Sequence, residues 1–158
     1  MFEGLWKKTK IADVVNQKVC TIKGEVQASS TLNFPLSNTK CVFFSVLEER
    51  FGKGARRSGR SLWFPDKMEN KSSEFTITDG AAQIHIRENG DRIVVKGAHQ
   101  EAGLVRGNRR RRYFASLIKP GDIVVIRGLV NVKPDKNERF ISAPPNGRLK
   151  VKVIRRVP

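Results

Sequence analysis

A strict alternation of side chains over residues 18–28, KVCTIKGEVQA, constrains the fold of this chain more than any other feature. Cys20, Ile22 and Val26 occupy alternate positions, and the positions between them are mostly polar. Side chains of a β-strand point alternately to its two faces, so the segment predicts a strand with one buried face that includes Cys20. Gly24 falls on that buried face, where the missing side chain lets a strand bend or lets another element approach closely.

The second cysteine lies in PLSNTKCVFFSVLEER, residues 35–50. Apolar residues occupy both sets of alternate positions after Cys41, which predicts a strand that is covered on both faces. The hydrophobic neighbours favour a core cysteine over a reactive thiol. A disulfide between Cys20 and Cys41 stays open as the less favoured alternative, and two cysteines without CxxC or Cys/His spacing predict no zinc site.

The rest of the chain supplies further short strands and one expected helix. Asp79-Gly80 and Asn89-Gly90 separate apolar alternations between residues 75 and 95, as in a meander with tight turns. Strands are also expected over 122–133, 138–143 and 148–157. The spacing of four apolar residues predicts a short amphipathic helix before Pro120-Gly121; these are Tyr113, Phe114, Leu117 and Ile118.

Together these elements predict a mainly β fold: a small OB-fold-like antiparallel Greek-key barrel with one short helix and long basic loops. Gly24 and Gly128 would let the two longest strands curve. At 158 residues the chain has the size of one domain. We expect an N-terminal tail or short helix over 1–17 and the barrel over 18–158. The barrel would carry a basic insert near 51–72, either a long loop or an extended hairpin tip.

The order of several motifs resembles a known family, the GIDE domain. The resemblance runs over residues 18–148 and lies in TIKGEVQASSTLNFPLSNTKCVFFSVLEER, Trp63 in a basic insert, FTITDGAAQIHI, IKPGDIVVIRGLV and FISAPPNG. GIDE domains occur in membrane-anchored RING ubiquitin ligases and are similar to OB-fold-like bacterial proteins of unknown role. The resemblance implies a recognition or assembly module. It does not imply ligase activity, because this sequence has neither the transmembrane segments nor the zinc ring.

The sequence shows no pattern of an enzyme. His85 and His99 are the only histidines, and we expect both to be exposed and without partners. Phosphate-loop, zinc-protease and nucleophile-elbow motifs are missing, so we expect no catalytic residues, cofactor or metal. No apolar run reaches the roughly 20 residues of a membrane span. We therefore expect a cytoplasmic protein, and the aromatic and lysine residues of its first ten positions leave membrane association open.

Basic residues are the strongest functional signal. Lys and Arg number 31 against 15 Asp and Glu, a net charge of +16, and such a field attracts polyanions. We expect two loop clusters to form an anion- or nucleic-acid-binding rim, made of Lys53, Arg56, Arg57, Arg60, Arg106, Arg109, Arg110, Arg111 and Arg112. Trp63 and Tyr113 are possible stacking residues, although packing at a barrel end explains them better. The arginine run is equally compatible with a solvated surface.

Two functions follow from these patterns. The first is a non-enzymatic OB-like module that binds an anionic partner, with single-stranded nucleic acid as the leading candidate. The second is an accessory module that contacts an acidic protein or an anionic membrane surface, in line with the GIDE resemblance.

Overall fold

The computed structural model describes residues 7–53, 61–135 and 137–158, and for Lys53 and Ser61 the description covers the backbone alone. Most of these residues form β-strands, apart from two short 3-10 turns, η1 (Ile11–Asp13) and η2 (Gly90–Arg92). The strands are β1 (Val19–Gln27), β2 (Leu32–Asn33), β3 (Lys40–Cys41), β4 (Phe43–Lys53), β5 (Ser61–Ser72), β6 (Phe75–Thr78), β7 (Gln83–Ile86), β8 (Ile93–Lys96), β9 (His99–Val105), β10 (Asn108–Ile118), β11 (Ile123–Lys133), β12 (Glu138–Ser142) and β13 (Leu149–Arg155).

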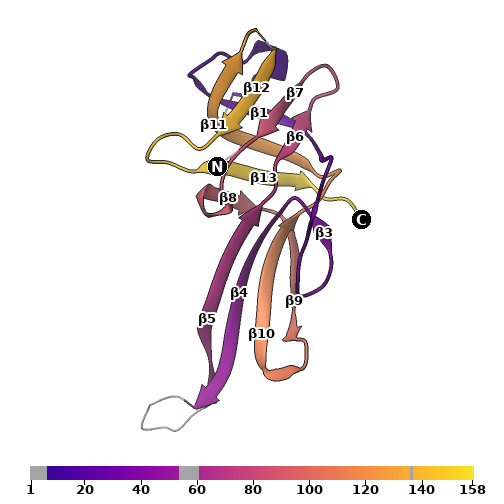
Figure 1. Ribbon diagram of the computed structural model, residues 1–158, viewed down its shortest axis with the longest axis vertical. Coiled ribbons are helices and arrows are strands. Elements are labelled where there is room, and N and C mark those ends of the chain that lie inside the picture. The colour runs from indigo at the N-terminus through magenta and orange to yellow at the C-terminus, as the bar shows by residue number, and fades with distance from the viewer. Residues whose placement is uncertain (1–6, 54–60, 136) are drawn as a thin grey trace.

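Five strands close into a barrel at one end of the molecule (Figure 1). Around it the neighbours are β1, β6, β7, β12 and β11, and β11 pairs back with β1 over residues 19–25. β13 and β8 continue the same sheet beyond β11. The prediction of a mainly β chain with a barrel is confirmed. The expectation of an antiparallel barrel is wrong for one of its pairs, because β12 and β7 are parallel; β13 and β8, beyond the barrel, are parallel as well.

The barrel core consists of the side chains that alternation assigns to the buried face. Each of them is at most 3% exposed: Ile22, Val26, Phe75, Ile77, Ile84, Ile86, Val124, Ile126 and Val130. Cys20 is only half-buried. The two predicted glycines allow close approach, because a Cβ at Gly24 would clash with the Thr78 carbonyl on β6 and one at Gly128 with the Ser142 carbonyl on β12.

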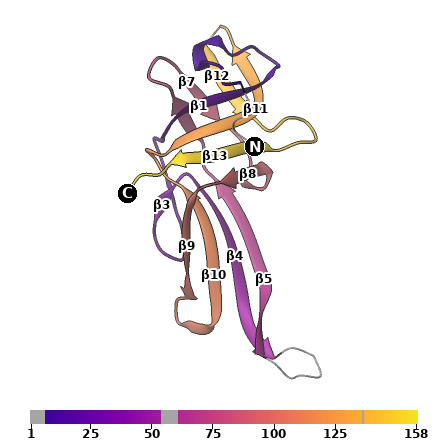
Figure 2. The ribbon, with the colours of Figure 1, turned by 180° about the vertical axis from the view of Figure 1, so that it is seen from behind.

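A second sheet projects from the barrel as an elongated arm (Figures 1 and 2). We call this sheet the arm; its strand order is β5-β4-β10-β9. It is rooted in the barrel, because Phe43 at the start of β4 and Ile118 at the end of β10 belong to the barrel core. The segment around β2 and β3 covers one face of the arm, where Phe34, Phe44 and Tyr113 form a separate small core.

The arm accounts for two differences from the sequence-based expectations. The predicted helix is wrong, since its four apolar residues lie within β10, where Tyr113 and Leu117 point to the small core. When both faces of a strand carry apolar residues, some of these residues are spaced by chance as they would be on one face of a helix. For the basic insert near 51–72 the sequence predicts either a long loop or an extended hairpin tip. The hairpin is confirmed, since β4 and β5 pair from Phe43↔Ser72 to Lys53↔Ser61.

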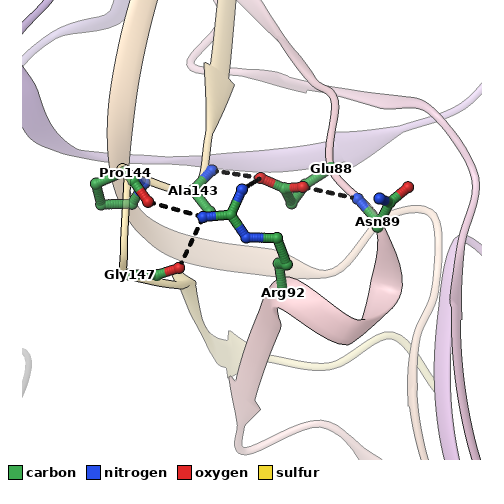
Figure 3. A network of polar contacts seen from close by, with 6 residues as sticks. All are labelled: Glu88, Asn89, Arg92, Ala143, Pro144 and Gly147. Atoms are coloured by element: carbon green, nitrogen blue, oxygen red, sulfur yellow. Dashed lines mark hydrogen bonds and ion pairs between the residues drawn. The ribbon is translucent and has the colours of Figure 1, made fainter.

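A polar network fixes the turn before β8 to the loop between β12 and β13 (Figure 3). Arg92 Nη2 donates to the carbonyl oxygens of Pro144 (2.9 Å) and Gly147 (3.1 Å). Glu88 Oε1 accepts from the Ala143 amide at 2.8 Å and lies 3.7 Å from Arg92 Nη1. The expectation of a tight meander turn at Asn89-Gly90 is wrong: residues 90–92 form the 3-10 turn η2, and the next strand, β8, pairs in parallel with β13 instead of with β7.

The remaining expectations concern cysteines and membrane spans. Cys20 and Cys41 are both free, and Cys41 is fully buried, as the core interpretation predicts. Asp79-Gly80 forms the expected tight turn: Gly80 has φ +94°, and Asp79 Oδ1 accepts from the Ala81 and Ala82 amides. Within the described ranges, no helix has the length and apolarity needed to cross a membrane.

Candidate nucleic-acid interface

The predicted binding rim divides into a described part and an undescribed part. Arg56, Arg57 and Arg60 lie outside the described residues, and Lys53 is described only as the backbone end of β4. The remaining five lie on or beside β10: Arg106, Arg109, Arg110, Arg111 and Arg112. The expectation that this cluster occupies a loop is wrong for four of them, since only Arg106 lies in the β9–β10 turn.

Arg106, Arg109 and Arg110 form the exposed end of the arm, and we call them the tip arginines. All three side chains are exposed. None of them forms an ion pair with any residue in the described part of the chain. Three uncompensated guanidinium groups at a projecting end give a local positive field that favours a polyanion.

Arg111 and Arg112 differ from the tip arginines because carboxylates of the arm pair with them. Arg111 Nη2 contacts Asp66 Oδ2 at 2.5 Å and Glu48 Oε1 at 3.4 Å. The hydrogen bond to Asp66 is the main reason that the pKa of Arg111 is raised. Arg112 Nε donates to Glu49 Oε1 at 2.7 Å. The protein's own acids therefore compensate half of the four-arginine run.

Neither predicted stacking residue offers a free ring. Tyr113 is 7% exposed and packs edge-on against Phe34, with ring centroids 5.6 Å apart. Burial, and then the charge of Glu101, raises the pKa of its hydroxyl. Trp63 is half-buried on β5, with Phe51 against its edge at 5.1 Å and the Arg112 guanidinium 4.3 Å from the ring centroid. Packing explains both, although within the arm rather than at a barrel end.

The structure exposes an aromatic side chain in the segment for which we predicted a helix. Phe114 lies on the arm face opposite the small core, and its side chain is 44% exposed. Met68 on β5 is 70% exposed and Leu104 on β9 is 58% exposed. In a strand over 113–117, the side chains of Tyr113 and Leu117 point to one face and that of Phe114 points to the other, so this exposure follows once the segment is known to be a strand.

The histidines are not the exposed, unpartnered groups that we expected. His99 Nε2 lies 3.0 Å from Oδ1 of Asp122, a fully buried carboxylate. His85 is half-buried, and its ring centroid is 5.2 Å from that of Phe140. Both contacts join elements that lie far apart in sequence. Among the described residues, no group of three or more His, Cys, Asp or Glu side chains is arranged to hold a metal ion.

No protein-family model, curated protein or solved structure matches this chain. Its function must therefore be inferred from its own geometry. The described arm combines a charged end, the tip arginines, with an exposed apolar face that includes Phe114. Basic residues beside exposed aromatic side chains are the general features of proteins that bind single-stranded nucleic acid.

Proposed function

We propose that this protein is a non-enzymatic binding module whose arm binds single-stranded nucleic acid. One observation carries the proposal: the three tip arginines, exposed and without ion pairs to the described residues, lie on β10 and in the turn before it, and β10 also carries the exposed ring of Phe114. A single strand offers phosphates for the arginines and unstacked bases for the apolar face. The OB-like character of the barrel and the GIDE resemblance belong to this proposal as predictions, and both favour a recognition module.

A second candidate function is protein interaction. The exposed side chains of Met68 and Leu104 support it, because aliphatic groups on an open sheet face are typical of contacts between proteins. We favour nucleic acid because the net charge of +16 and the unpaired tip arginines match a phosphate chain.

The test is a titration of a fluorescent single-stranded oligonucleotide at several salt concentrations. An Arg106→Ser, Arg109→Ser, Arg110→Ser variant removes the tip charges. A matched control removes three exposed arginines near the C-terminal end, Arg148, Arg155 and Arg156. For single strands each phosphate contact contributes about 0.7 to the slope of log affinity against log salt. Loss of three contacts should therefore flatten the slope by about 2.

The wild-type protein should bind the oligonucleotide in about 50 mM salt, where electrostatic contacts are strong. The tip variant should bind weakly with the flatter slope, and the control should keep most of the wild-type slope. Absence of wild-type binding, or equal slopes for the two variants, would contradict the proposal. Absence of binding would leave the protein-interaction function as the better account.

A further inference from the structure

Strand pairing places four apolar side chains of the arm, two of them the exposed Phe114 and Met68, in one row across all four strands. Met68 on β5 is opposite Leu47 on β4, Leu47 is opposite Phe114 on β10, and Phe114 is opposite Ala102 on β9. Paired residues of antiparallel strands point to the same face of the sheet. We call this surface, with Leu104 and Arg112 in the next row, the open face.

The fold itself does not bury the open face. The small core on the other side is complete, because Phe34 from the covering segment packs on Phe44 and Tyr113. Phe114, Met68 and Leu104 are 44%, 70% and 58% exposed on the open face, so this apolar surface lacks cover from the described chain. A contiguous exposed apolar surface of this kind marks an interaction site.

The surroundings of Phe114 indicate what the open face contacts. The Arg112 guanidinium lies between two rings, 4.3 Å from the Trp63 centroid and 5.1 Å from the Phe114 centroid. Glu49 pairs with Arg112 and compensates its charge. The open face therefore presents planar groups with little net charge, while the tip arginines lie at the start of the same strand, β10, and in the turn before it. Uncharged planar groups suit the faces of bases, and unpaired cations suit the phosphates that join them.

From this arrangement we infer that the open face holds a stacking subsite for an unpaired base, centred on Phe114. The inference rests on the proposed function and adds a specificity to it. The bases of a duplex stack on one another, so their faces are closed to a side chain, whereas a single strand exposes them. The tip arginines bind the phosphates of a duplex as well as those of a single strand, whereas Phe114 contributes to the binding free energy only when the bases are unpaired.

The test compares Phe114→Leu with Phe114→Trp. Leucine keeps an apolar side chain but removes the ring, and tryptophan restores a ring. Each variant and the wild type is titrated with a thymidine oligonucleotide, an abasic oligonucleotide of equal length and a duplex. Urea unfolding of each variant verifies that the fold is kept.

Phe114→Leu should bind the thymidine oligonucleotide about 5- to 150-fold more weakly than wild type, the range for loss of one stacked base. Phe114→Trp should restore binding, and affinity for the abasic strand and the duplex should not change. If Phe114→Leu binds the thymidine oligonucleotide as wild type does while the tip variant is weakened, the stacking subsite is overturned and the proposed function stands. If wild type binds none of the three, both are overturned. An equal loss for thymidine and abasic strands would also overturn the subsite.

Discussion

Replacement of Asp122 should test the junction between barrel and arm. This carboxylate is fully buried just before β11. Its Oδ2 accepts from the Lys119 amide at 2.9 Å, and its Oδ1 accepts from the Val157 amide at 2.9 Å and lies 3.0 Å from His99 Nε2. One side chain therefore joins the end of the arm strand β10, the start of β9 and the C-terminal segment.

The expected magnitude follows from these three contacts. Asp122→Ala leaves two backbone amides and an imidazole without their acceptor, and each buried polar group without a partner costs about 1–3 kcal/mol. Because the donors are only partly buried, water replaces some of the loss, and we expect a decrease in the free energy of unfolding of about 3–5 kcal/mol. For a chain of this size that lowers Tm by about 6–20 °C. His99→Ala removes one contact and should cost about 1 kcal/mol.

Urea unfolding followed by circular dichroism measures both values, with thermal unfolding as a second measurement. Asp122→Asn serves as the conservative control. Its side chain keeps one acceptor oxygen, but its NH2 group faces a backbone amide that is also a donor. The decrease in the free energy of unfolding should therefore lie between those of His99→Ala and Asp122→Ala. If Asp122→Ala is within 1 kcal/mol of wild type, or costs no more than His99→Ala, the assigned role of this carboxylate is wrong.

Two further predictions concern the core. Gly24→Ala should reduce the free energy of unfolding by about 1–3 kcal/mol because its Cβ meets the β6 backbone. Gly103→Ala on β9 is the control, because its Cβ would make an ordinary contact 3.4 Å from the Tyr113 ring. This variant should have unchanged stability or gain up to about 1 kcal/mol. Equal changes in stability for Gly24→Ala and Gly103→Ala would refute the close-approach argument. Burial is the main reason that the pKa of the Cys41 thiol is raised from 9.0 to about 11. Between these two pH values the folded protein keeps the thiol proton, whereas the unfolded chain releases it. Wild type should therefore lose about 2 kcal/mol more stability between pH 9 and 11 than Cys41→Val, and parallel pH profiles would contradict this.

The barrel core could be predicted from the sequence because alternation acts locally. Ile22, Val26 and Ile126 show the period of two that a half-buried strand requires, and Gly24 marks the close approach to β6. The apolar pattern at 113–118 predicts a helix wrongly because both faces of β10 carry apolar residues there, which hides the period of two of a strand. Which of the two faces is covered depends on Phe34, a residue of a distant segment.

The candidate site could be predicted only in part, because charge compensation depends on tertiary pairing. The sequence shows four adjacent arginines, but it does not show that Glu48 and Glu49, 63 residues away, pair with Arg111 and Arg112. The contact of His99 with Asp122 likewise joins different elements. The exposure of Phe114 follows only when the strand and its covered face are both known.

The most direct test of the central claim is hydrogen–deuterium exchange of the wild-type protein with and without a saturating single-stranded oligonucleotide. Binding to the arm should slow exchange in β9, in β10 around the tip arginines and Phe114, and in the central part of β4. Strands β7 and β12 on the far side of the barrel should exchange at unchanged rates. Protection confined to the barrel, with unchanged exchange in β9 and β10, would contradict the assignment of nucleic-acid binding to the arm.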